Sequence, residues 1–169
     1  MILALGILAI GVLARFMPHA PNFTPVLALA LFGGVYLKRS QAILVPLALM
    51  MVTDLFLGTY PSMPFTWVSI LLVSAIGLLV RKAPGIKNTL IGSVGSAVVF
   101  FIVSNFGVWL LWYPHTMEGF LACYALAVPF FRGTLVSTLL YSVVLFGAYE
   151  VLASQIRKTR LAPVLIGRE

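Results

Sequence analysis

One acidic side chain stands inside an otherwise apolar stretch of this sequence. Asp54 lies near the end of the run 41–58. A carboxylate within a membrane helix costs about 2.5–3.5 kcal/mol on insertion scales, so it is rarely present without a role. That role could be in a ligand site. The alternatives are that the carboxylate caps a loop, pairs with a basic residue or reaches the nearer membrane surface.

A second group combines an amide with two indole rings. Asn105, Trp109 and Trp112 are spaced i, i+4 and i+7, which places them on one face of a helix. An amide and indoles on one stripe can hydrogen-bond and stack a planar ligand. The alternative is an aromatic belt at the membrane surface. A belt accounts for Trp112 and Tyr113 but explains Asn105 poorly.

Two short connecting segments carry further polar and aromatic side chains. The segment PHAPNFTP contains His19 and Asn22, and the segment GTYPSMP contains Tyr60 and leads into Thr66 and Trp67. Thr66 and Trp67 could line the mouth of the same site as Asp54. Trp67 could instead belong to the aromatic belt. A loop histidine such as His19 is more often simply solvated.

The sequence argues against an enzyme, a metal site and a cofactor. It has one cysteine and two histidines that lie far apart, which excludes an internal disulfide and supports no metal-ligand set. Cys123 could be a reactive thiol or a soft-metal ligand, but a free membrane cysteine usually packs as a small apolar residue. Arg132 could pair with Asp54 or Glu118, or contact an anionic ligand. No catalytic triad, paired-carboxylate site or phosphate loop is present.

The composition predicts an integral membrane protein. Of 169 residues, 62% are hydrophobic and 9% are charged, and the mean hydropathy is +1.10. Soluble domains carry about a quarter charged residues, so this chain cannot cover a water-facing surface. The net charge of +7 is placed in short loops rather than on a polar fold, so nucleic-acid binding is not expected. Contact with anionic lipid is the expected use of this charge.

The basic residues predict the topology. Apart from Arg15 and Arg132, the lysines and arginines fall at every second boundary between apolar stretches, which is the positive-inside pattern. We therefore predict an all-α bundle of six transmembrane helices with both termini inside. The predicted spans are 2–17, 25–37, 41–58, 65–80, 88–112 and 133–154. The span 25–37 is short for a bilayer and must tilt, extend into the loop or be covered by its neighbours.

The stretch between the last two spans is too short to cross a membrane. Residues 120–131 are predicted to form an outer half-helix that stops near Pro129, because a full crossing would move the C-terminal basic cluster outside. The domain assignment is a six-helix transmembrane domain over 1–154 and a cytoplasmic basic tail over 155–169. The small-residue pairs Ala30/Gly34 and Gly92/Ser96 predict close helix packing inside the bundle more than a partner interface.

Three blocks of the sequence resemble a known group of transport proteins. They are PNFTPVLALALFGGVYL, TDLFLGTYPSMPFTW and SNFGVWLLWYP with CYALAVPFFRGTL, spread over residues 15–147. They resemble a family of small bacterial putative transport proteins that is similar to the substrate-binding S-components of energy-coupling factor vitamin transporters. The acid followed by FLG and then Pro64-Phe65, at the turn into the next helix, is the most telling match.

The resemblance implies a substrate-capturing protein of the bacterial cytoplasmic (inner) membrane. It implies an outward-facing pocket for a vitamin-like nutrient. Carried over by position, its candidate residues are His19, Asn22, Asp54, Tyr60, Trp67, Asn105 and Trp109. S-components work with a coupling subunit and ATPases. Their Ala-x-x-x-Ala docking motif is replaced here by Ala4, Ala9 and Ala14, five residues apart, which favours a solitary transporter.

Two functional hypotheses therefore stand. The first is a solitary or coupled uptake protein; a solitary cobalamin transporter is the similar precedent, so cobalamin is one candidate ligand. The alternative is a non-catalytic accessory subunit of a larger membrane complex. A lined cavity at the outer end favours the first hypothesis, and a solid core with a flat helix face favours the second.

Overall fold

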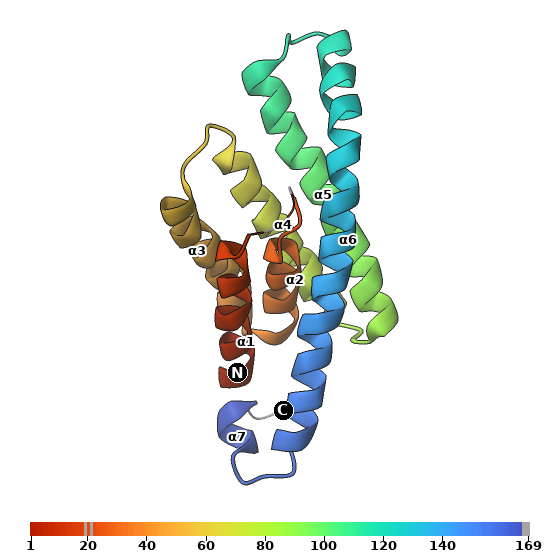
Figure 1. Ribbon diagram of the computed structural model, residues 1–169. Coiled ribbons are helices and arrows are strands. Elements are labelled where there is room, and N and C mark those ends of the chain that lie inside the picture. Colours follow the sequence, from red (N-terminus) through yellow and green to blue (C-terminus); the bar gives the residue numbers. More distant parts are fainter. Residues whose placement is uncertain (19, 21, 167–169) are drawn as a thin grey trace.

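The computed structural model describes residues 1–18, 20 and 22–166, and the regular structure in this part of the chain is helical (Figure 1). The elements in order are α1 (Ile2–Leu13), the 3-10 helix η1 (Ala14–Phe16), α2 (Val26–Tyr36), α3 (Arg39–Leu57), α4 (Met63–Val80), α5 (Ile86–Trp112), α6 (Met117–Ile156) and α7 (Ala162–Leu165).

The predicted all-helical class of fold is confirmed for the described residues. The helices α3, α4, α5 and α6 are each long and apolar enough to cross a membrane. The stretch Ile2–Phe16 and the helix α2 are apolar but shorter. The bilayer core is about 30 Å thick, so a helix of 11 residues, about 16 Å long, covers only about half of it.

The short helix α2 occupies the centre of the bundle. It packs against α1, α3, α4, α5 and α6, and nine of its 11 residues are buried. Its Phe32 ring is fully buried and meets the rings of Phe146 and Tyr149 edge-on, with centroids 5.3 and 5.8 Å apart. Of the three ways in which a short second helix could be accommodated, the structure shows cover by its neighbours.

Close backbone contact joins α2 to α4. A Cβ atom added at Gly34 would contact the Ser74 carbonyl oxygen and lie 2.7 Å from the Cα of Gly77. A Cβ atom added at Gly77 would contact the Leu31 carbonyl oxygen in the same way. Gly92 of α5 similarly faces Val80 of α4. These small residues pack inside the bundle, as predicted for Gly34 and Gly92.

The prediction of a separate half-helix at 120–131 is wrong. These residues belong to α6, which runs without interruption for 40 residues and includes Pro129 in its interior. Proline removes one backbone hydrogen bond, yet the residues on both sides of Pro129 remain helical. The exposed Arg132 also lies within this helix rather than at its end. At 1.5 Å per residue α6 is about 60 Å long, twice the thickness of a bilayer core.

The two ends of the bundle differ in charge. Lys38, Arg39, Arg81 and Lys82 surround one surface hollow, and a guanidinium nitrogen of Arg81 donates to the Leu37 carbonyl at 2.8 Å. We call this the basic end; α2 ends there and α3 and α5 begin there. The opposite end contains η1, the start of α2 and the α3–α4 connection. In Figure 1 the N-terminus and α7 both lie toward the basic end.

Candidate functional site

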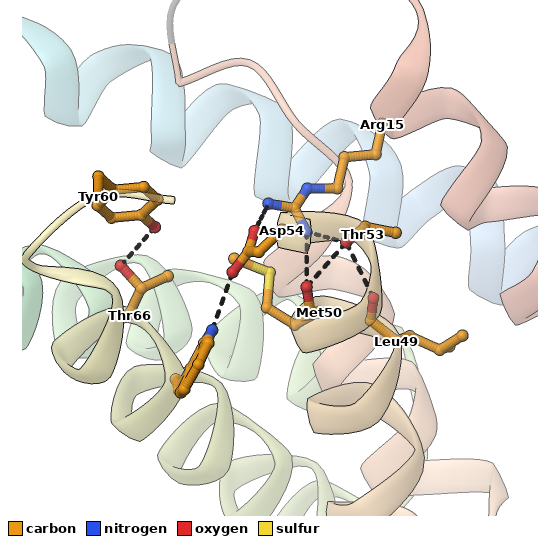
Figure 2. Close-up of polar contacts among 8 residues, drawn as sticks. Arg15, Leu49, Met50, Thr53, Asp54, Tyr60 and Thr66 are labelled. Atoms are coloured by element: carbon orange, nitrogen blue, oxygen red, sulfur yellow. Dashed lines mark hydrogen bonds and ion pairs between the residues drawn. The ribbon is translucent and has the colours of Figure 1, made fainter. Parts of the chain in front are cut away.

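A buried ion pair joins three elements at the end opposite the basic end. Arg15 of η1 pairs with one carboxylate oxygen of Asp54 near the end of α3, and their side chains are 12% and 1% exposed (Figure 2). The indole Nε1 of Trp67 in α4 donates to the other carboxylate oxygen at 2.9 Å. Both oxygens of the buried acid are therefore satisfied, by a cation and by a neutral donor.

The guanidinium group of Arg15 makes further bonds to α3. It donates to the hydroxyl of Thr53 and to the Met50 carbonyl oxygen, the latter at 3.3 Å (Figure 2). The Thr53 hydroxyl in turn lies 2.9 Å from the carbonyl oxygens of Leu49 and Met50. This network fixes η1 against α3 and α4. It is a structural anchor, and its Arg15 side chain borders a cavity.

The cavity beside this ion pair has a polar wall. It has a volume of about 240 Å³ and is bordered by Arg15, the loop before α2, the start of α2, α3, the α3–α4 loop, α4, α5 and α6. We call it the first lobe. Its polar lining residues, apart from Arg15, are Asn22, Thr24, Tyr60, Thr66, Thr134, Ser137 and Thr138. The first turn of α2 has no side-chain cap, so its backbone N–H groups add donors beside this space.

A second lobe adjoins the first and is more aromatic. Its volume is about 310 Å³, and it shares Asn22, Tyr60, Thr66, Phe100 and Thr134 with the first lobe. Its other lining residues are Phe101, Ser104, Asn105, Val108, Ala127, Phe130 and Phe131. The rings of Phe101 and Phe131 have their centroids 5.0 Å apart. Aromatic rings with a few polar groups are typical of small-molecule pockets.

The structure brings five of the seven predicted site residues to this region. Asn22 and Tyr60 line both lobes and Asn105 lines the second, where its side-chain nitrogen donates to the Phe101 carbonyl at 2.8 Å. Asp54 and Trp67 line neither lobe. They reach the site through Arg15, which lines the first lobe.

The other two predicted residues do not join the group. Trp109 lies apart: its indole donates to the Pro114 carbonyl at 3.1 Å and its ring packs against Phe106 and Phe120. His19 lies outside the described residues. Asn22 itself has a φ of 58°, a left-handed conformation that asparagine tolerates better than most residues.

Sequence reasoning missed the partner of Asp54 and most of the hydroxyl wall. Arg132 was considered as the partner, but the structure pairs Asp54 with Arg15. The available signal was that Arg15 stands outside the basic clusters. The hydroxyls of Thr134, Ser137 and Thr138 recur at helical spacing within an apolar helix, and this spacing is the signal that could have indicated the hydroxyl wall. Cys123 is buried, and its thiol faces the Asn105 carbonyl at 3.6 Å.

Tyr60 provides a test of how dry the cavity is. Partial burial raises the pKa of Tyr60, and the negative charge of Asp54 adds to the effect. The hydrogen bond to Thr66 and the positive charge of Arg15 act on this pKa in the opposite direction without cancelling the rise. The midpoint for tyrosinate formation at this residue is therefore expected above the ordinary value of about 10. Because the folded-state pKa exceeds the unfolded one, the stability contributed by neutral Tyr60 is complete below about pH 10 and is lost as pH rises through the folded pKa. Ultraviolet titration of the wild type against Tyr60→Phe isolates this group, and a midpoint at or below the ordinary value contradicts the prediction.

Comparison with known proteins identifies the family of this chain but gives no activity for it. No curated protein and no solved structure matches the chain. Residues 1–162 match a family described as a family of unknown function, DUF6580. This match covers nearly the whole sequence, and the chain therefore belongs to the DUF6580 family.

Proposed function

We propose that this protein captures a small, vitamin-like organic molecule in the two-lobed cavity and takes it up across a bacterial cytoplasmic membrane. The observation that carries the proposal is a polar and aromatic cavity inside a bundle whose helices are otherwise apolar. Polar groups inside a membrane bundle are costly, and they commonly mark a substrate pathway. The resemblance to S-components supports the same function.

The two lobes suit different parts of one ligand. The first lobe offers hydroxyls and an amide, and the second offers the rings of Phe100, Phe101 and Phe131. A molecule with a planar ring and several hydrogen-bonding groups would use both. Because Asp54 neutralises Arg15, the cavity favours a ligand of little net charge. The lobe volumes favour a compound smaller than cobalamin, since pockets of about 300–1,000 Å³ hold drug-sized ligands.

The proposal includes a topology. In it α1 with η1 and α2 complete six spans with α3–α6, and the basic end faces the cytoplasm because lysine and arginine are retained there. The cavity then opens toward the outside. Uptake is proposed to proceed either with a coupling subunit and its ATPases or without them, since Ala4 and Ala9 do not form the docking motif.

One observation favours the alternative of an accessory subunit. In Figure 1 the α5–α6 connection stands well beyond the α3–α4 connection, so the two long helices project from the rest of the bundle. Large apolar side chains beside the α5–α6 connection are exposed, among them Trp112, Met117 and Leu121. Such a surface suits contact with another membrane protein or with lipid.

The test fills the cavity and compares the small molecules that co-purify. Ala127 lines the second lobe, whereas its neighbour Leu126 is 64% exposed on the outside of α6. We expect mass spectrometry to find one compound with the wild type and with Leu126→Trp, and about a hundredfold less with Ala127→Trp, because the indole occupies the ligand's space. Equal amounts in both variants, or an empty wild type that co-purifies with fixed membrane subunits, would overturn the proposal.

A further inference from the structure

A second hollow lies near the basic end of the bundle, bordered by buried residues such as Ser142 and by exposed ones such as Ile86 and Glu150. Its volume is about 280 Å³ and it is lined from α2, the α4–α5 connection, α5 and α6. Its lining residues include Val35, Tyr36, Thr89, Ser142, Phe146 and Glu150. The hydroxyl of Tyr36 donates to a Glu150 carboxylate oxygen at 2.8 Å. We call this space the inner cavity.

The first lobe and the inner cavity lie along the same three helices. On α6 the first lobe reaches Thr138 and the inner cavity begins at Ser142, one helical turn or about 6 Å away. On α2 the corresponding residues are Leu27 and Val35, which lie near opposite ends of this short helix. A thin layer of protein therefore separates the two spaces.

That layer consists of small hydroxyl residues, which we call the hydroxyl septum. Its members Ser93, Ser96, Thr138 and Ser142 are each fully buried. On α5, Thr89, Ser93 and Ser96 share one face at spacings of four and three residues. On α6, Thr134, Thr138 and Ser142 share one face at spacings of four. The stripes on both helices run from one cavity to the other.

Hydrogen bonds hold the septum closed, but its hydroxyl oxygens can still accept further hydrogen bonds. The Ser93 hydroxyl lies 2.8 Å from the Ser142 hydroxyl and 2.8 Å from the Thr89 carbonyl oxygen. The hydroxyls of Ser96 and Thr138 each donate at 2.7 Å to the carbonyl one turn earlier in their own helix. A hydroxyl that donates this way keeps lone pairs free to accept a bond from a passing solute.

Ordinary helix packing is the competing explanation of these hydroxyls, because Ser and Thr commonly join membrane helices. A packing stripe, however, is expected to end among packed side chains, whereas this stripe ends in a cavity on each side. The buried residues of α5 are also all small: Thr89, Gly92, Ser93, Ser96, Ala97 and Gly107. The septum itself therefore contains no large side chain; farther along α5, Phe101 packs against Tyr124 and Phe131 of α6.

We propose that the hydroxyl septum is the closed gate of a solute route that runs between α5 and α6 from the first lobe to the inner cavity. The inference rests on the proposed uptake function and adds its path: the solute crosses the protein itself. The septum residues carry no charge, so the route fits a small uncharged solute with hydrogen-bond donors. Breaking the Ser93–Ser142 hydrogen bond opens the septum, and its return closes the septum.

Thiol labelling tests the route without a ligand. Cys123 is the single cysteine, so Cys123→Ala gives a thiol-free background in which to place Ser93→Cys. Its neighbour Val94 is 42% exposed on the outer surface of α5 at the same depth, and Val94→Cys is the matched control. The probe is a membrane-impermeant, uncharged methanethiosulfonate that carries a sugar group, so it resembles the proposed class of solute. It is added to sealed vesicles of each orientation, and intact-mass spectrometry measures the labelled fraction.

The Ser93→Cys thiol is expected to react from both sides, about tenfold faster than the Val94→Cys thiol, because only a thiol that water reaches can ionise and react. Ser142→Cys is an independent second position with the same expectation. Reaction from one side only, or from neither side at both positions, overturns the route. If a compound co-purifies but labelling is one-sided, the proposed uptake function stands and the route through the septum is overturned. If labelling is two-sided but no compound co-purifies, the route stands and capture of a tightly held ligand is overturned.

Discussion

Asp54→Ala is expected to lower the free energy of unfolding by about 3–5 kcal/mol, the usual cost of removing one partner of a buried ion pair. The substitution leaves the Arg15 guanidinium nearly buried without its counter-charge, since that side chain is only 12% exposed. The indole N–H of Trp67 loses its acceptor at the same time. The anchor that holds η1 against α3 and α4 is then broken.

Thermal unfolding of the detergent-solubilised protein, followed by tryptophan fluorescence, measures this effect. Glu118→Ala is the control: Glu118 is exposed in the first turn of α6, where an acid contributes about 0.3–1 kcal/mol. The double variant Arg15→Met/Asp54→Leu removes both charges and is expected to recover most of the loss. If Asp54→Ala unfolds no earlier than Glu118→Ala, the ion pair is not the anchor described above.

Gly34→Ala and Gly77→Ala are expected to destabilise the bundle by at least about 1–3 kcal/mol, the range for overpacking. Each new methyl group would meet backbone atoms of the facing helix rather than the end of a flexible side chain. The contact can be relieved only if α2 and α4 move apart. Because α2 is the central helix, that movement would also disturb its packing on α3, α5 and α6.

Gly6→Ala is the matched control for the two glycine variants. Gly6 lies in α1, and an added Cβ atom would meet nothing within 4 Å. This substitution is expected to stabilise the protein by about 0.5–1 kcal/mol, because alanine is the better helix former. The same unfolding assay applies to all three variants. Unfolding temperatures for Gly34→Ala and Gly77→Ala that match or exceed that of Gly6→Ala would contradict the close α2–α4 contact.

Helix positions could be predicted well because apolar length and loop chemistry determine them locally. The predicted span 65–80 compares with Met63–Val80 and the predicted span 88–112 with Ile86–Trp112. The exception is α6, where the sequence predicts a half-helix that stops near Pro129, whereas Pro129 and Arg132 both lie inside one helix. Each costs a helix something, but the apolar and helix-favouring residues around them maintain one continuous helix. A single proline or arginine in the sequence does not show whether the residues around it favour the helix enough to outweigh its cost.

The site was less predictable because its contacts are distant in sequence. Arg15 and Asp54 are 39 residues apart, and the sequence alone offers several basic partners for one acid. The cavity hydroxyls of Thr134 and Thr138 have the same spacing as hydroxyls that only pack helices together. What distinguishes the two uses is empty space between helices, and that depends on the shapes of all the surrounding side chains.

The central position of α2 has a consequence for how the chain is made. Ribosomes synthesise α2 before α4, α5 and α6, the helices that later bury most of its surface. Until then the bilayer must accommodate a segment of 11 residues, about half the usual crossing length, with polar backbone at both ends. The core around α2 therefore stays incompletely packed through most of synthesis. The last long helix to be synthesised, α6, completes that packing.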